Sequence, residues 1–273
     1  MKILTWNTAG RNKKIKEQFD LIKSQSPDVL CLQEIQASGD EVWHNLLKNE
    51  YKFVYSSKDF VRHRLKTGPR KYNLIIATSL PSKIDLAASS YVPWIERLLV
   101  VKLHESELRI ATTHIPPGGN NGWVKIDFFE GLYDLLESKK VILTGDFNSP
   151  RKEFKDGTLV TWGQRITSKG EIRLRKRIKG EDGLRWHQGE YNLLKGISSI
   201  GYVDYFRRTH GYNNNTYSWI TSTNKNIRYR FDHVLGPEYI KVESIQYLNG
   251  VIDLKLSDHV PLQIDLDSDS QIF

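Results

Sequence analysis

The sequence predicts an α+β protein, a four-layer α/β/β/α sandwich in which two mixed sheets pack face to face with helices outside. One observation is that the chain has two strand-rich halves, each with amphipathic helices. The other is that four apolar runs of strand character end in polar residues, namely Asn7, Gln33-Glu34, Asp146-Phe147-Asn148 and Asp258-His259. Because continuous apolar runs suit strands covered on both faces, we expect these ends to meet between the sheets.

The first half opens with a strand, a helix and a second strand. Residues 2–6 alternate as a strand does, and apolar residues over 15–22 recur at helical spacing until Ser26-Pro27-Asp28 stops the helix. The apolar run 29–34 predicts the second strand. We then expect a short helix at about 40–48 and strands at 51–55, 73–78, 98–103 and 108–114, the last two forming a hairpin.

The second half starts where Pro116-Pro117-Gly118-Gly119 ends that hairpin. A helix is expected at 123–136, leading into the buried strand 141–145. Residues 151–190 are polar and irregular, and a helix resumes at 190–200. The remaining strands are expected at 216–220, 228–235, 242–248 and 259–266. We therefore expect one domain, 1–273, with a basic insertion at about 151–189.

Composition excludes several classes of protein. No run reaches the roughly 18 apolar residues of a membrane span, and the chain begins with a strand-like segment, so we expect a cytoplasmic monomer that spans no membrane. Cys31 is the only cysteine and lies in an apolar run. It cannot form a disulfide within the chain or a zinc-thiolate site, and a structural thiol is the expected role.

The charge pattern favours a polyanionic partner. The formal net charge is +8, and residues 164–185 hold eight basic residues against three acidic ones. A second cluster comprises Arg62, Arg64, Lys66, Arg70 and Lys71. Either cluster alone could be a solvated loop. Two clusters near a site that handles phosphate favour nucleic acid, and we expect the DNA backbone to contact Arg173, Arg175, Lys176 and Arg177.

The polar strand ends supply what phosphodiester hydrolysis requires: a metal, a group to activate water and donors for the developing charge. Glu34 offers the hard carboxylate that Mg²⁺ prefers, Asn7 can hold Glu34 or the metal shell, and Asp258 could join that shell. Asp146 is the candidate acceptor for the proton of the attacking water, and Asn148 can orient the same water. The alternative is that Asp146 and Asn148 only form a turn.

Two histidines are candidates for the same site. His259 cannot easily pair with its neighbour Asp258 on an extended strand, so we expect it to meet Asp232, which would keep it protonated against the phosphate. His114 ends the strand before the Pro-Gly loop and is a second candidate. A lone histidine is more often a core or surface residue than a catalyst, and we interpret His233 in that way.

Six ordered motifs together resemble the endonuclease/exonuclease/phosphatase superfamily: Trp6-Asn7, Leu32-Gln33-Glu34, Thr113-His114, Gly145-Asp146-Phe147-Asn148, Phe231-Asp232-His233 and Ser257-Asp258-His259. Residues 201–207, 216–219 and 229–232 are similar to the exonuclease III branch, whose members are Mg²⁺-dependent DNA repair nucleases. The resemblance implies a deoxyribonuclease I-like sandwich, with Glu34 as metal ligand beside Asn7. It also implies that Asp146 and Asn148 handle water and phosphate, that Asp232 supports His259, and that Trp219 and Tyr229 line an abasic-site pocket.

The chain departs from the exonuclease III branch at two positions. Ala9 stands where relatives usually carry an Asp, and His114 stands where they usually carry a Tyr. We expect a Mg²⁺-dependent phosphodiesterase that hydrolyses DNA as an endonuclease or exonuclease, for example in DNA repair, with Mn²⁺ as a substitute. The alternative is a phosphatase or phosphodiesterase acting on a small-molecule or lipid-headgroup phosphoester. A nucleic-acid-binding protein without chemistry is a third hypothesis.

Overall fold

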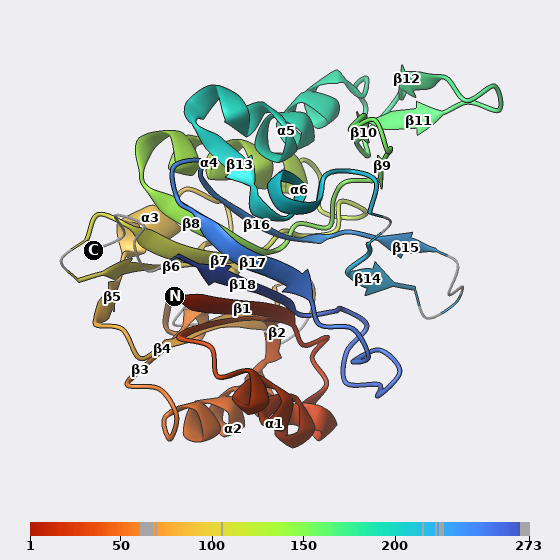
Figure 1. Ribbon diagram of the computed structural model, residues 1–273. Coiled ribbons are helices and arrows are strands. Elements are labelled where there is room, and N and C mark those ends of the chain that lie inside the picture. The colour runs from red at the N-terminus through yellow and green to blue at the C-terminus, as the bar shows by residue number, and fades with distance from the viewer. Residues whose placement is uncertain are drawn as a thin grey trace.

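The computed structural model describes residues 1–60, 68, 70–104, 106–214, 216–221, 223 and 227–267. Two six-stranded mixed sheets pack against each other, and helices cover both outer faces (Figure 1). The predicted four-layer α+β sandwich is therefore confirmed. Arg62, Arg64 and Lys66, which belong to the second basic cluster, lie outside the described residues.

The first sheet has the order β17-β18-β1-β2-β4-β3. Its strands are β1 (Lys2–Asn7), β2 (Val29–Gln36), β3 (Phe53–Ser56), β4 (Tyr72–Thr78), β17 (Val242–Tyr247) and β18 (Leu262–Leu266). The helices α1 (Ile15–Gln25) and α2 (Ala37–Leu47) lie below it in Figure 1. Because β1 and β2 are parallel, with Asn7 opposite Gln33, their carboxyl ends reach the same edge.

The second sheet has the order β13-β16-β8-β7-β6-β5. Its strands are β5 (Ser82–Ile84), β6 (Leu98–Leu103), β7 (Arg109–His114), β8 (Val141–Asp146), β13 (Tyr202–Asp204) and β16 (Asp232–Pro237). The helices α4 (Val124–Ser138) and α5 (Leu184–Leu194) lie above it in Figure 1, and α3 (Leu86–Ser89) and α6 (Tyr205–His210) are shorter. The parallel pair β7 and β8 places His114 opposite Asp146, and antiparallel β16 starts at Asp232, also opposite Asp146.

Alternation along single strands builds the two core layers. On β6, Leu99 and Val101 join the apolar cluster between the sheets, whereas Leu98 and Val100 join the cluster beneath α4 and α5. All four side chains are fully buried. The continuous apolar runs predicted as strands covered on both faces are therefore covered in that way.

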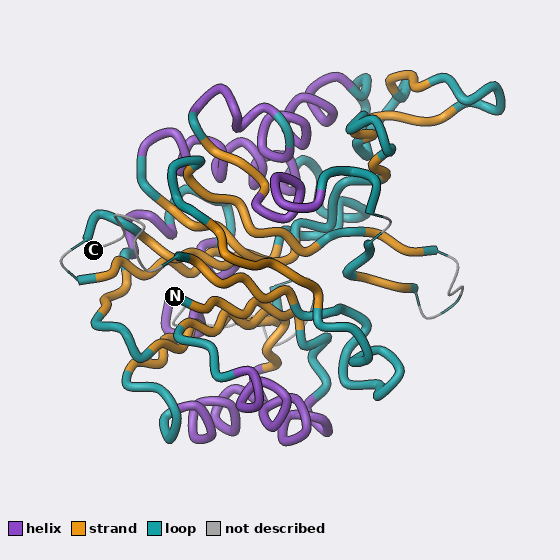
Figure 2. Tube along the Cα trace, in the orientation of Figure 1, coloured by secondary structure: helices purple, strands orange, loops and turns teal. Residues whose placement is uncertain are grey.

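The insertion departs from the expected irregular stretch 151–190. It contains the short strands β9 (Lys152–Glu153), β10 (Leu159–Val160), β11 (Gln164–Ile166) and β12 (Ile172–Leu174), and the β11–β12 hairpin projects from the body (Figure 2). The helix expected from residue 190 begins earlier, because α5 starts at Leu184. A 3-10 helix, Gly196–Ile200, follows α5. The start of α5 was missed because its buried face includes the polar residue Glu190 beside Trp186 and Leu193.

The strands of the last third are shorter than expected. The hairpin of β14 (Trp219–Ile220) and β15 (Arg228–Tyr229) is separate from both six-stranded sheets. β18 starts three residues later than expected, after Pro261, which has no backbone N–H to donate to a ladder. No described helix has the length and apolarity that a membrane crossing requires.

Candidate active site

The site forms where four strands from two sheets bring their ends together. Asn7 ends β1, Asp146 ends β8, His114 ends β7 and Asp232 begins β16. The strands β7 and β8 approach closely at Gly145, where a Cβ atom would lie 2.0 Å from the carbonyl oxygen of Thr113. Only glycine fits there, which explains the glycine that precedes the catalytic candidate Asp146.

The backbone is strained around these strand ends. Ala9, Glu34 and Asn148 have φ angles of 55°, 58° and 51°, and they make up half of the six non-glycine residues with positive φ in the described part of the chain. Glu34 lies within the register shift of β2 against β4. Such conformations cost of order 1–3 kcal/mol each and cluster at functional sites. They turn the ends of otherwise regular strands toward one another.

Asn7 joins the two sheets. Its Nδ2 donates to Glu34 Oε1 at 3.1 Å and to Asp146 Oδ2 at 2.9 Å, and its Oδ1 accepts from the N–H of Ala9 at 2.9 Å. The Asn7 side chain is fully buried. It therefore holds the Glu34 and Asp146 carboxylates at a set separation, which is the holding role expected for it.

The two carboxylates carry negative charge that the protein only partly compensates. Burial raises the pKa of Glu34, and it raises the pKa of Asp146 to about 7 even though the His259 charge opposes the rise. Two carboxylates with raised pKa values, held close together, favour a cation between them. Mg²⁺ is commonly held by one or two protein carboxylates with water completing the shell, so Glu34 and Asp146 fit such an ion.

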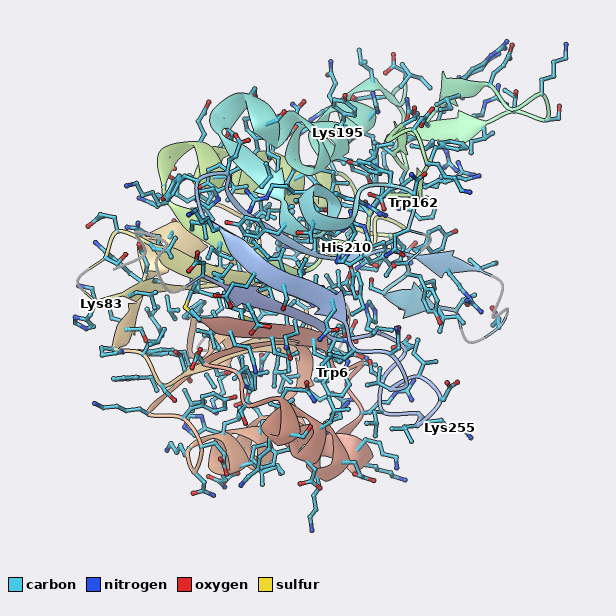
Figure 3. All side chains as sticks on the ribbon, viewed as in Figure 1. Trp6, Lys83, Trp162, Lys195, His210 and Lys255 are labelled. Atoms are coloured by element: carbon cyan, nitrogen blue, oxygen red, sulfur yellow. The ribbon has the colours of Figure 1, made fainter. Side chains whose placement is uncertain are left out.

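His259 is paired as expected. Its Nδ1 lies 2.8 Å from Asp232 Oδ2, and its Nε2 lies 3.7 Å from Asp146 Oδ2. Burial disfavours the imidazolium, but the charges on Asp232 and Asp146 outweigh burial and raise the pKa of His259 to about 10. The backbone carbonyl of His259 accepts from Nε1 of Trp6 at 3.0 Å, and Trp6 is labelled in Figure 3. His259 is therefore a fixed, protonated donor at neutral pH.

His114 has a partner that the sequence analysis missed. Nη1 of Arg97, from the turn before β6, contacts His114 Nδ1, and both side chains are buried. Burial and the Arg97 charge lower the pKa of His114 well below its usual value, so the ring is neutral. Since a guanidinium can only donate, the ring proton lies on Nε2, which is 3.4 Å from Glu34 Oε1. The Nε2–H of His114 therefore faces the Glu34 carboxylate, and these two side chains form one cluster with Asp146.

Asp258, expected to join a metal shell, lines the same cleft as Glu34 and Asp146, but its side-chain partner is an aromatic residue. Its Oδ2 accepts from Trp219 Nε1 at 3.1 Å. In two groups of described side chains, three ligand atoms lie within 4.8 Å of one another, and neither group includes Asp258. Asp258 therefore anchors an aromatic ring at the rim. His233 is fully buried, and its Nε2 lies 2.8 Å from the carbonyl oxygen of Ser149, so of the core and surface roles expected for it the structure has the core one.

The site opens into a cleft of about 870 Å³ with an aromatic wall and a basic wall. Tyr229 stacks on Phe231 with ring centroids 4.8 Å apart and packs against Trp219 at 5.9 Å. The predicted residues Trp219 and Tyr229 thus line the same cleft as Asp146 and His259. Trp162, from the insertion, packs on Tyr229 at 5.7 Å and extends this wall.

The predicted DNA-binding residues divide into two pairs. Arg175 and Arg177 line the cleft, and their guanidinium groups make no hydrogen bond or ion pair with a described residue. Arg173 is exposed and pairs with Glu171 at 2.6 Å, and exposed Lys176 does not line the cleft. Lys179 lines it as well and was not among the predicted binding residues.

Comparison with known proteins identifies the family of this chain. The model of the Endonuclease/Exonuclease/phosphatase family matches residues 4–259. A DNA-(apurinic or apyrimidinic site) endonuclease from Dictyostelium discoideum is 21% identical over 277 residues, which cover 98% of this chain and 71% of that protein.

Two solved structures share the fold. One is an AP endonuclease from Archaeoglobus fulgidus, with a TM-score of 0.71, 19% identity and coverage of 98% of this chain and 99% of that chain. The other is the 3′ phosphatase NExo from Neisseria bound to a product DNA hairpin, with a TM-score of 0.65, 18% identity and the same coverage. With strand ends, carboxylates and histidines placed as described, this chain belongs to the endonuclease/exonuclease/phosphatase family, is similar to the exonuclease III-like branch, and is a phosphoester-hydrolysing enzyme.

Proposed function

We propose that this protein is a Mg²⁺-dependent phosphodiesterase that hydrolyses DNA, as an endonuclease or exonuclease of DNA repair, with Mn²⁺ as a substitute metal. One observation carries the proposal: carboxylates suited to a divalent cation and a protonated histidine share a cleft with stacked aromatic rings and with two arginines whose guanidiniums have no partner among the described residues. Aromatic faces and unpaired guanidiniums are what DNA bases and phosphates bind.

Each side chain has a role in this reaction. Glu34 and Asp146 would hold the ion, which when bound neutralises phosphate oxygens. Asp146, which the N–H of Asn148 fixes through Oδ1, would accept the proton of the attacking water. His259 donates a hydrogen bond to a phosphate oxygen as charge develops there, and Asp232 keeps it charged.

Similarity to DNA-processing proteins supports DNA as the substrate. The Dictyostelium and Archaeoglobus relatives are named for cleavage at apurinic or apyrimidinic sites, and the Neisseria protein was solved with DNA. The insertion adds Arg175, Arg177 and Lys179 to the cleft. The guanidinium groups of Arg175 and Arg177 have no partner among the described residues, and the phosphates of a DNA backbone would supply one.

A second candidate is a phosphatase or phosphodiesterase on a small-molecule phosphoester. It is favoured by the buried Arg97–His114 pair, which places a guanidinium and an imidazole N–H beside Glu34. Two further donors at the cleft floor would suit the extra charge of a terminal phosphate. The cleft as a whole is larger than such a group needs.

One experiment separates these functions. Purified protein is incubated with supercoiled plasmid, an abasic duplex, a duplex with a 3′-phosphate and a panel of small phosphomonoesters, with Mg²⁺, with Mn²⁺ or with excess EDTA. We expect strand cleavage with either metal and none with EDTA, and no cleavage by Asp146→Asn. Full activity in EDTA would exclude the metal dependence. Release of phosphate from the small esters with intact DNA would favour the second candidate.

A further inference from the structure

Asn148 contacts both carboxylate oxygens of Asp146. The Asn148 N–H donates to Asp146 Oδ1 at 2.8 Å, and Nδ2 lies 3.4 Å from Asp146 Oδ2. Nδ2 also donates to the carbonyl oxygen of Ile115 at 2.9 Å. Asn148 therefore touches both oxygens of the proton acceptor. It does so from a left-handed backbone conformation that needs outside support to persist.

That support is a pair of donors on one carbonyl. The backbone oxygen of Asn148 accepts from Nζ of Lys125 at 2.7 Å and from Nε1 of Trp162 at 3.0 Å. Lys125 is buried on α4, and its Nζ lies 5.8 Å from the centroid of the Trp162 ring. Trp162 lies near the base of the insertion (Figure 3). The carbonyl of Asn148 therefore accepts one hydrogen bond from the helix α4 and one from the insertion.

One buried carboxylate holds both donors. Glu190, fully buried on α5, accepts the backbone N–H of Trp162 through Oε2 at 2.8 Å. Its Oε1 lies 3.4 Å from Lys125 Nζ and accepts from Trp186 Nε1 at 2.8 Å. A buried ion pair often contributes little net stability compared with an apolar replacement, so stability alone does not explain it. Glu190 instead fixes the directions of two donors, because it contacts Lys125 Nζ and the backbone N–H of Trp162.

We propose that Lys125 and Trp162 are positioning residues that hold the Asn148 carbonyl and, through Asn148, the Asp146 carboxylate in the geometry needed for turnover. The insertion then has a role in the chemical step that is separate from binding of the substrate backbone. The inference rests on the proposed function for its kinetic readout and on the hydrogen bonds above for its structural one.

The test removes one donor at a time. Trp162→Phe keeps the aromatic ring and deletes Nε1, Lys125→Met deletes the ammonium, and Lys125→Arg keeps a donor. Trp123→Phe is the matched control, because Trp123 packs on Trp186 with ring centroids 5.6 Å apart, Trp186 donates to the same Glu190, and Nε1 of Trp123 does not donate to Asn148. The readouts are kcat and KM on the DNA substrate, the unfolding midpoint, and the NMR signal of the Asn148 amide.

We expect Trp162→Phe and Lys125→Met each to lower kcat by about 10- to 100-fold with KM nearly unchanged, as for other residues that orient catalytic groups. Lys125→Arg should recover part of the loss. The double variant should lose less than the product of the two single losses, since both donors act on one carbonyl. The Asn148 amide signal should move in both single variants and stay in place in Trp123→Phe.

Three results would overturn the inference. They are a wild-type kcat in folded Trp162→Phe and Lys125→Met, a raised KM with unchanged kcat, and an unmoved Asn148 amide. If the wild type hydrolyses no DNA, the proposed function fails, while the amide signal still decides whether the two donors position Asn148. If one variant does not fold, the other carries the test.

Discussion

Two buried charge clusters lie near the start of β16 and behave oppositely. In the site, the pKa values of Glu34 and Asp146 are raised, the latter to about 7. In the cluster of Glu153, Asp204, Arg207 and Arg230, the Arg230 and Arg207 contacts outweigh burial and lower the pKa of Glu153 to about 2, and Arg230 likewise lowers that of Asp204. All four carboxylates are largely removed from water, so burial alone does not decide the direction.

The difference lies in the partners. Glu153 accepts from Nη2 of Arg207 at 2.6 Å and from Nη2 of Arg230 at 2.8 Å, and Arg230 also reaches Asp204 at 2.7 Å. The site carboxylates instead share the neutral amide of Asn7, with histidine nitrogens 3.4 to 3.8 Å away. A cluster that balances its own charge serves structure. A cluster that leaves charge uncompensated is ready for a metal ion and a proton.

The largest expected effect tests the structural cluster. Arg230→Met leaves Glu153 and Asp204 buried with one guanidinium fewer, and we expect a loss of about 3–5 kcal/mol in the free energy of unfolding at pH 7. Urea denaturation measures it. Lys102→Met, which breaks an exposed pair with Glu107, is the control and should leave the midpoint almost unchanged. Equal effects of the two substitutions would contradict the distinction between the clusters.

Acid should weaken the wild type in the same region. The folded pKa of Glu153, about 2, lies below its ordinary value of 4.5, so its contribution is complete above about pH 4.5 and is lost as the pH falls toward 2. Arg230→Met should therefore be destabilised most at neutral pH, and its stability should approach that of the wild type in acid. A constant difference from pH 7 to pH 3 would argue against this assignment.

Substitutions in the site should cost turnover and not folding. Asp146→Asn loses the proton acceptor and His259→Ala loses the charged donor, so each should lower kcat by roughly a hundredfold or more. Each variant must still unfold cooperatively, so that lost turnover reports on the site and not on folding. Wild-type turnover in either variant would remove that residue from the site, and loss of cooperative unfolding would show that it belongs with the structural cluster.

Without a bound metal ion, the Asp146 carboxylate should lower the free energy of unfolding at neutral and alkaline pH. Its folded pKa, about 7, lies above its ordinary value of 3.8, so the folded state binds more protons between these values and stability falls as the pH rises through them. In EDTA at pH 8, Asp146→Asn should be more stable than the wild type by about 1–3 kcal/mol, with less difference at pH 4. Added Mg²⁺ should stabilise only the wild type appreciably. A less stable variant at pH 8 would contradict uncompensated charge in the site.

The smallest expected effect concerns the basic residues at the rim of the cleft. Arg175→Ala with Arg177→Ala should reduce the slope of log affinity for DNA against log salt by about two units, since each phosphate contact contributes about 0.9. Arg173→Ala with Lys176→Ala, from the same segment but outside the cleft, should change it little. If all four residues contacted phosphate, as the sequence predicts, replacing them together would remove roughly three to four units. Equal slopes for the two double variants would show that the cleft does not select the contacts.

Periodicity and strand ends in the sequence are enough to predict the sandwich and which polar strand ends it brings together. Continuous apolar runs must be covered on both faces, and parallel neighbours present their carboxyl ends at one edge, so the pattern brings Asn7 to Glu34. Asp146 meets them because the second sheet packs face to face on the first. The sequence predicts that His259 pairs with Asp232 because its neighbour Asp258 is excluded on an extended strand, and the structure has this pairing although His259 precedes β18. These inferences depend on local periodicity, which a sequence displays.

The contacts that depend on direction come from tertiary packing alone. Arg97 behind His114, and Lys125 and Trp162 on the Asn148 carbonyl, belong to segments whose sequence carries no periodic or motif signal for a site. The turn of Asp258 toward Trp219 depends on the rim hairpin. Hydrogen-bond direction and burial arise when distant segments pack, and the same packing determines whether a buried carboxylate meets a guanidinium or is left for a metal ion.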